Sequence, residues 1–251
     1  MLSALIPPGL DATVATALLG TSFAASFITI AFGLGGGILL LSVMASLMPP
    51  AMLIPVHGMV QSGSNAGRAA LMLRFVSWPN VGVFTIGTII GASIGGLVAV
   101  NLQPAFVQIG VGLFVIWSVL SHPPAWLRRM PALTGAFSSF LTMFFGATGP
   151  FVATFVRSLG MDRHGFVATH ATLMTVQHVA KTVVFGLVGI AFGPWLLFCA
   201  AMIAAGFVGT MAGRLVLNRI SDQRFQKVLN AILLVLALRL IWQGTGALTG
   251  A

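Results

Sequence analysis

The sequence predicts an all-α polytopic membrane protein made of two inverted-topology repeats, each with about five helical segments and a broken or re-entrant glycine-rich segment. The first observation is composition. Of 251 residues, 58% are hydrophobic and 6% are charged, with a mean hydropathy of +1.05, whereas soluble domains carry about 25% charged residues. The second is a series of apolar runs that approach the ~20 residues a bilayer-spanning helix needs. The third is an internal repeat.

The apolar runs predict ten helices, separated by prolines and glycines that interrupt regular structure. We expect them near 12–32, 35–48, 51–73, 79–100, 104–121, 132–147, 150–160, 165–191, 194–217 and 223–243. Segments 35–48 and 150–160 are short for a full crossing. Either they span the membrane or they re-enter it, and the sequence leaves both open.

The repeat appears when the chain is shifted by 113 residues. The shift superposes His57 on His170 and Arg68 on Lys181, and aligns the glycine motifs 32–37 and 145–150. Such repeats are common in secondary transporters. We therefore divide one transmembrane domain into a first repeat (1–121), a cytoplasmic linker (122–131) and a second repeat (132–251).

Charge placement predicts the orientation of these repeats. If the loops alternate between sides, the basic residues between helices all fall on one side: Arg74, Arg128, Arg129, Arg157, Arg163, Arg214, Arg219, Arg224 and Lys227. By the positive-inside rule that side is cytoplasmic. Both termini are then non-cytoplasmic, the second repeat is inverted, and the location is the cytoplasmic (inner) membrane. The net charge of +9 is thereby explained without nucleic acid as a partner.

Two polar stripes interrupt the apolar pattern. In the first half, five polar residues occupy one face of a helix over roughly 16 Å. In the second half, the aligned helix carries polar residues at the same spacing. The stripes comprise His57, Gln61, Ser64, Asn65 and Arg68, then His170, Gln177, His178 and Lys181.

The cations on these stripes have no acidic partner in a membrane helix. A charge near the bilayer centre costs at least ~2.5–3.5 kcal/mol, yet the acids of the chain are only Asp11, Asp162 and Asp222, in loops or at helix ends. A negatively charged substrate is the natural partner of Arg68 and Lys181.

The glycine motifs Gly33–Gly37 and Gly146–Pro150 support this interpretation. Glycine allows the backbone to turn at depth, and a helix that begins at such a break presents unpaired N–H groups that favour anions. Gly35, Gly36 and Gly149 are therefore further candidates for substrate binding.

The stretch "FGLGGGILLLSVMASLMPPAMLIPVHGMVQSGSNAGRAAL" resembles the sulfite exporter TauE/SafE family, also called the toluene sulfonate uptake permease family. The second half matches more loosely, because Thr148, Gly149 and Pro150 stand where the family often repeats a glycine triplet. The resemblance covers nearly the whole chain and implies transport of sulfite or an organosulfonate such as sulfoacetate. It also implies an anion site formed by His57, Arg68, His170 and Lys181, with Gln61, Asn65, Gln177 and His178 as further donors.

The favoured mechanism is secondary transport by alternating access, coupled to protons through the histidines, which titrate in the physiological range. No nucleotide-binding loop is present, and neither cofactor nor metal is expected. Three alternatives stay open: an uncoupled anion channel, a divalent metal transporter that uses His57, His170 and His178, and an intramembrane enzyme with Ser64 beside His57. The direction of transport, the coupling ion and the oligomeric state are also open.

Overall fold

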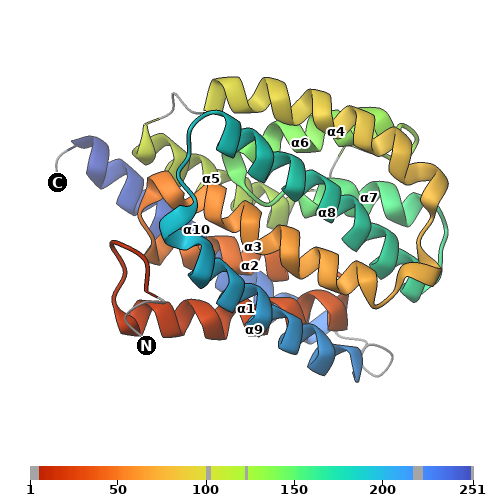
Figure 1. Cartoon of the computed structure of the whole chain (residues 1–251), viewed down its shortest axis with the longest axis horizontal. Coiled ribbons are helices and arrows are strands. Elements are labelled where there is room, and N and C mark those ends of the chain that lie inside the picture. Colours follow the sequence, from red (N-terminus) through yellow and green to blue (C-terminus); the bar gives the residue numbers. More distant parts are fainter. Residues whose placement is uncertain (1–5, 100–102, 122–123, 217–222, 250–251) are drawn as a thin grey trace.

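The computed structural model describes residues 6–99, 103–121, 124–216 and 223–249, and all regular structure within them is helical. Most helix axes run along the long axis of the molecule (Figure 1). The ten α helices are α1 (Ala12–Phe32), α2 (Gly36–Leu47), α3 (Pro50–Ala70), α4 (Trp78–Ala99), α5 (Pro104–Leu120), α6 (Pro131–Phe145), α7 (Gly149–Ser158), α8 (Arg163–Leu187), α9 (Leu196–Arg214) and α10 (Gln223–Thr249). Short 3-10 helices are η2 (Leu73–Phe75), η3 (Ala125–Arg128) and η4 (Gly193–Trp195). The predicted all-helical fold class is confirmed.

Helices α2 and α7 are too short to cross a membrane. With 12 and 10 residues and a rise of 1.5 Å per residue, they extend about 18 and 15 Å, about half of the ~30 Å hydrocarbon core. Each follows a glycine break, so each begins inside the protein. The structure therefore favours re-entrant segments over full spans at 35–48 and 150–160.

The expected helix ends differ more than the starts: α8 ends at Leu187, four residues before 191, and α10 continues six residues beyond 243, to Thr249. Gly244 lies so close to the backbone of α5 that an added Cβ would come within 2.9 Å of the Ala105 carbonyl oxygen. Packing against α5 thus allows the helix to continue past Gly244, although the low helix propensity of glycine predicts an end there.

Helices of the two expected repeats pair with one another. The main contacts join α1 to α9, α4 to α6, α3 to α8 and α5 to α10. Each of these pairs takes one helix from residues 1–121 and one from 132–251, so the two halves share a single core. The inversion of the repeats stays a prediction.

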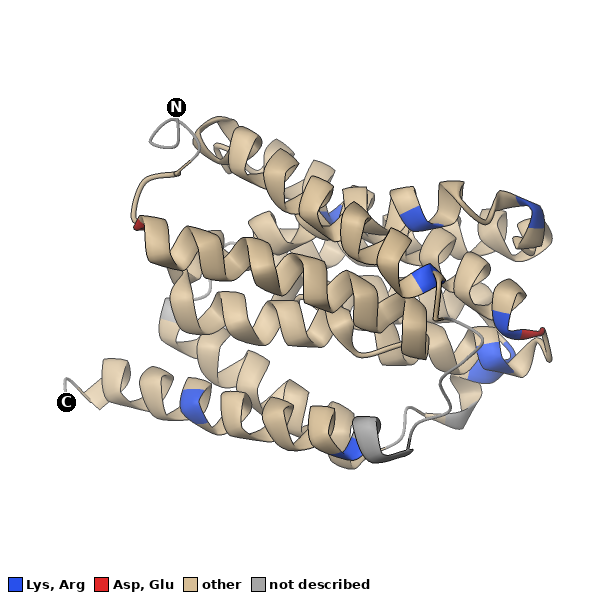
Figure 2. Ribbon diagram, turned by 90° about the horizontal axis from the view of Figure 1, so that it is seen from below, with Lys and Arg blue, Asp and Glu red and all other residues tan. Residues whose placement is uncertain are grey.

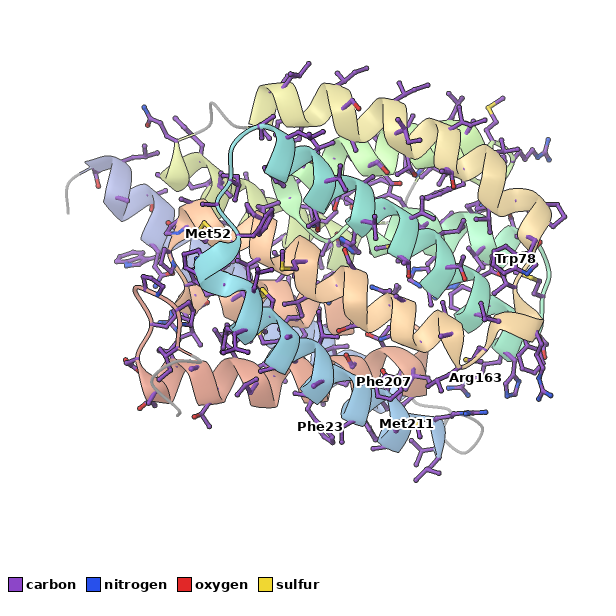
Figure 3. The ribbon with its side chains drawn as sticks, in the orientation of Figure 1. Phe23, Met52, Trp78, Arg163, Phe207 and Met211 are labelled. Carbon is purple, nitrogen blue, oxygen red and sulfur yellow. The ribbon has the colours of Figure 1, made fainter. Side chains whose placement is uncertain are left out.

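The side chains are distributed as a lipid environment requires. Arg68 and Lys181 are 2% and 0% exposed, whereas Leu187 and Trp242 are 82% and 81% exposed. The outer surface of α1 and α9 is lined with apolar side chains such as Phe23, Phe207 and Met211 (Figure 3). Among the described residues, four segments are long and apolar enough to span a bilayer: Ala12–Phe32, Trp78–Ala99, Gly193–Arg214 and Lys227–Thr249. This pattern fits a membrane protein.

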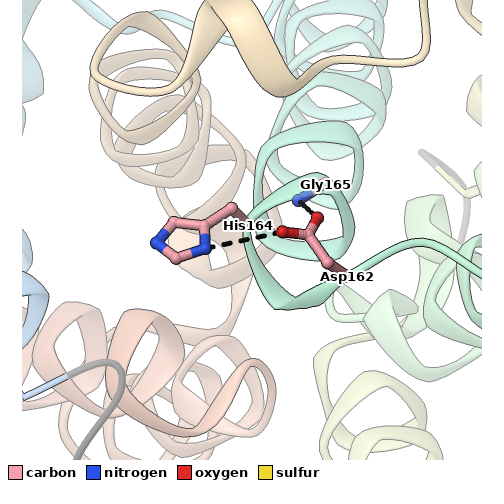
Figure 4. Close-up of polar contacts among 3 residues, drawn as sticks. All are labelled: Asp162, His164 and Gly165. Atoms are coloured by element: carbon pink, nitrogen blue, oxygen red, sulfur yellow. Dashed lines mark hydrogen bonds and ion pairs between the residues drawn. The ribbon is translucent and has the colours of Figure 1, made fainter.

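Lysines and arginines gather at the end of the bundle remote from both termini (Figure 2). We call this the basic end and the opposite one the terminal end. At the basic end, the Asp162 carboxylate accepts from the Gly165 N–H at 2.8 Å and lies 3.7 Å from His164 (Figure 4). The neighbouring Arg163 donates to the Ala31 carbonyl at the end of α1. The placement of charge agrees with the predicted partition; which end is cytoplasmic stays a prediction.

Candidate functional site

Two helix breaks at matching places in the two halves form the framework of the site. Helix α1 ends at Gly33 and α6 ends at Gly146, with φ angles of +83° and +80°. Side chains disfavour this left-handed conformation, which glycine adopts freely. After each glycine the chain turns inside the protein. Helix α2 begins three residues after Gly33, and α7 begins three residues after Gly146.

A cavity of about 30 Å³ lies between the two breaks. The first turns of both half-length helices form part of its wall. A helix start leaves its first N–H groups without intrahelical partners, although in α7 Pro150 has no N–H and the Phe151 N–H donates to the Thr148 carbonyl at 3.1 Å. Such helix starts carry partial positive charge and attract anions. Its lining is Thr29, Leu34, Gly35, Gly37, Ile38, His57, Gln61, Asn65, Ala147, Gly149, Pro150, His170, Met174 and His178.

The two aligned histidines make the same contact in each half. Nε2 of His57 donates to the Gly37 carbonyl at 3.1 Å, and Nε2 of His170 donates to the Gly149 carbonyl at 3.3 Å. Because a carbonyl oxygen only accepts, Nε2 carries the proton in each ring. Each histidine thereby ties a full-length helix to the start of a half-length helix.

Two further imidazole nitrogens are left unpaired. Nδ1 of His57 and Nδ1 of His178 are buried and have no hydrogen-bond partner among the described residues. The two rings pack edge to face, with centroids 5.7 Å apart. Buried polar atoms are seldom unsatisfied, so these two nitrogens are open to a proton or a ligand.

The polar row of α3 delivers donors to the cavity. Nη1 of Arg68 donates to Oδ1 of Asn65 at 2.8 Å, and Nδ2 of Asn65 donates to Oε1 of Gln61 at 2.9 Å. This chain of bonds fixes the direction of both amides. The oxygen of Gln61 is occupied, so its NH₂ group is left to donate.

The polar residues Gln177 and Lys181 of α8 have a different role: they hydrogen-bond to the second helix break, between α6 and α7. Nζ of Lys181 donates to the Gly146 carbonyl at 3.0 Å. Nε2 of Gln177 donates to Oγ1 of Thr148, which itself donates to the Ser138 carbonyl at 3.0 Å. The lysine charge is also favourable there, since a helix C-terminus carries partial negative charge.

A family model described as sulfite exporter TauE/SafE matches residues 18–240, which include both breaks and both polar rows. The chain belongs to the sulfite exporter TauE/SafE family. No curated protein and no solved structure matches it. As a member of the TauE/SafE family it is a transmembrane transporter for sulfur-containing anions.

The residues proposed from sequence for the TauE/SafE site fall into two groups. Those that line the cavity are Gly35, His57, Gln61, Asn65, Gly149, His170 and His178. Those that do not are Gly36, Arg68, Gln177 and Lys181. Arg68 connects to the cavity through Asn65, while Gln177 and Lys181 contact the second break. Gly36 packs on α1, where an added Cβ would overlap the Ala25 carbonyl oxygen.

Sequence reasoning missed several apolar or weakly polar wall residues: Thr29, Leu34, Ile38 and Ala147. Leu34 had a usable signal, since it is flanked by the glycines of the first break. Thr29 had none, because it lies in an otherwise apolar run of α1. Pro150 was part of the aligned glycine motif without a role attached to it, and Met174 is the residue that the shift of 113 aligns with Gln61.

The electrostatics of the site favour anions. The charge of Lys181 acts on His57, and the charge of Arg68 acts on His170, so each cation lies near the histidine of the other half. The acids in the described part of the chain are Asp11, which caps α1, and Asp162, at the basic end. Neither cation forms an ion pair there.

Proposed function

We propose that this TauE/SafE protein moves a small sulfur-containing oxyanion, sulfite or an organosulfonate such as sulfoacetate, across the cytoplasmic membrane by alternating access. One observation carries the proposal. The starts of two half-length helices and histidines from both halves converge on one cavity, behind which lie two buried cations. Helix N-termini, amide N–H groups and guanidinium are all donors suited to oxyanions.

The size of the cavity supports a mechanism that involves motion. A volume of about 30 Å³ is close to that of one water molecule. Sulfite has four heavy atoms and needs more room, so the half-length helices α2 and α7 must separate when the anion binds. In alternating access, one half rocks against the other around such a midplane site.

The histidines support coupling to protons. A neutral imidazole whose Nε2 donates to a carbonyl presents only a lone pair at Nδ1, which repels an anion. Protonation converts the Nδ1 of His57 into a charged donor, and the buried, unpartnered Nδ1 of His178 lies on a ring packed against it. Anion and proton would therefore bind together, and the pH gradient would drive the anion.

The metal alternative has less support. The described residues contain no group of three or more histidine, cysteine, aspartate or glutamate side chains able to hold a metal ion. Arg68 and Lys181 would also repel a dication. An uncoupled anion channel could use the same donors, and it differs from a transporter in its kinetics.

Anion flux in proteoliposomes tests the proposal. Labelled sulfite and a small sulfonate would be supplied with and without a pH gradient, to the wild type, Arg68→Ala and Lys181→Ala. Arg239→Ala is the matched control, because Arg239 is an exposed cation on α10. We expect saturable flux that follows the pH gradient and is lost in the two buried-cation variants only. Flux that ignores both substitutions would overturn the assignment, and flux that follows the anion gradient alone without saturation would indicate a channel.

A further inference from the structure

A second cavity lies beside the central one, at the basic end of the bundle. Its volume is about 140 Å³, and it shares Leu34, Gly35, Ile38 and Pro150 with the lining of the central cavity. The shared residues form a thin wall between the two spaces. We call the second cavity the vestibule.

The vestibule is lined by polar groups that come from α5, α7 and α10: Ser118, Ser121, Thr154, Arg157 and Asn230. The guanidinium of Arg157 lies 5.6 Å from the centre of the Phe166 ring, and that ring stacks on His170 with centroids 5.7 Å apart. A cation at the vestibule is thus linked through one aromatic ring to a histidine of the central cavity.

Two groups of the vestibule are open to a ligand. Arg157 forms no ion pair with an acid in the described part of the chain, where the Asp162 carboxylate lies against His164 instead. The Ser118 hydroxyl is buried without a hydrogen-bond partner. Because guanidinium and hydroxyl groups both donate to oxyanions, the unpaired groups match the chemistry of the central site.

Size and position distinguish the vestibule from the other cavities. At about 140 Å³ it has room for a four-heavy-atom anion, which the central cavity in this conformation does not. The cavity nearest the terminal end, about 270 Å³, is lined only by apolar residues such as Ile54, Val107 and Phe185. An anion is therefore stabilised on the basic side of the wall rather than on the terminal side.

We propose that the vestibule is a second anion-binding site, in series with the central cavity, in which Arg157 and Ser118 hold a small oxyanion before or after it crosses the wall. The identity of the anion rests on the proposed function. The binding chemistry, a small oxyanion on a guanidinium and a hydroxyl, does not.

Equilibrium dialysis of the purified full chain in detergent against labelled sulfite tests this. We expect two sulfite ions per wild-type chain and one in Arg157→Gln, with the affinity of the lost site reduced about tenfold or more, as for loss of a charged hydrogen-bond donor. Arg157→Lys should retain two. Arg74→Gln is the matched control, because Arg74 is also exposed at the basic end and lies 4.6 Å from a phenylalanine ring, that of Phe75.

The outcomes separate this proposal from the proposed function. A single sulfite that is lost in Arg157→Gln but kept in Arg68→Ala would uphold the vestibule and count against the central site. A single sulfite lost in Arg68→Ala but kept in Arg157→Gln would overturn the vestibule alone. Binding of two ions by both Arg157→Gln and Ser118→Ala would also overturn it, and no binding by the wild type would overturn both sites. If Arg157→Gln does not fold, Ser118→Ala takes its place, with loss of one ion expected.

Discussion

Replacing Arg68 with methionine should abolish anion binding at the central cavity while leaving the fold intact. Arg68 is 2% exposed, donates to Asn65 at 2.8 Å, and has an Nε atom without a partner among the described residues. Its removal loses a charged hydrogen bond worth about 1.5–3 kcal/mol but relieves a buried charge that costs about 2.5–3.5 kcal/mol. These terms nearly cancel, so the free energy of unfolding without substrate should change by about 1 kcal/mol or less.

The assay is thermal unfolding of the detergent-solubilised protein, with and without sulfite. For the wild type, ligand at 100 times its Kd adds about 2.7 kcal/mol, which raises Tm by about 5–10 °C for a chain of this size. Arg68→Met should show the sulfite-free Tm of the wild type and a smaller rise than the wild type on addition of sulfite, because only the vestibule would still bind an ion. The control, Arg74→Met, removes an exposed cation at the basic end and should keep the rise. A full sulfite shift in Arg68→Met, or a sulfite-free Tm lowered by more than about 10 °C, would refute the reasoning.

Three other substitutions test the remaining parts of the site, and a fourth, Gly20→Ala, is a control. Lys181→Met should keep the sulfite-dependent rise in Tm but lose flux, as expected for Lys181→Ala, because Nζ bonds to the Gly146 carbonyl rather than lining the cavity; unchanged flux would count against a role at the break. Gly146→Ala should destabilise the protein by about 2–4 kcal/mol, since φ is +80° and the site is crowded. Gly20→Ala, where an added Cβ meets open space, should be neutral or stabilise by up to about 1 kcal/mol in the same melting experiment. His57→Gln can still donate to the Gly37 carbonyl but cannot take up a proton, so its flux should lose dependence on the pH gradient; an unaltered pH response would assign coupling to another group.

The helices were predictable because their signals are local. Apolar runs, prolines and glycines place α1 at the expected residues 12–32 and the other helix starts within about two residues. The end of α10 was not predictable, because Gly244 continues the helix only through its contact with α5. Whether 35–48 and 150–160 cross the membrane also depended on knowing each end to within a few residues, which sequence patterns do not provide.

The sequence predicted which residues belong to the site, but not which of them line the cavity and which lie behind its wall. Spacing along a helix identifies the face on which His57, Gln61, Asn65 and Arg68 lie. It does not tell at which depth that face meets a cavity, so Arg68 was expected to touch the anion and instead lies one hydrogen bond behind the wall. The contribution of the half-length helices was anticipated from the glycine motifs, and Gly35 and Gly149 do line the cavity.

The two polar rows diverge in a way that bears on mechanism. On α3, Asn65 donates both amide N–H groups to Gln61, so the NH₂ group of Gln61, a lining residue, is the amide donor left for the cavity. On α8, Lys181 and Gln177 donate hydrogen bonds to the turn that joins α6 to α7. We therefore propose that α3 contributes most to recognition of the anion, together with His170 and His178 of α8, which line the same cavity. Lys181 and Gln177 of α8 hold the turn before α7 in place. When the cavity widens, α7 can move only if the bond from Lys181 to Gly146 moves with it or breaks. Substitutions on α3 should accordingly raise the KM for sulfite, and substitutions of Lys181 or Gln177 should lower the rate of transport at saturating sulfite.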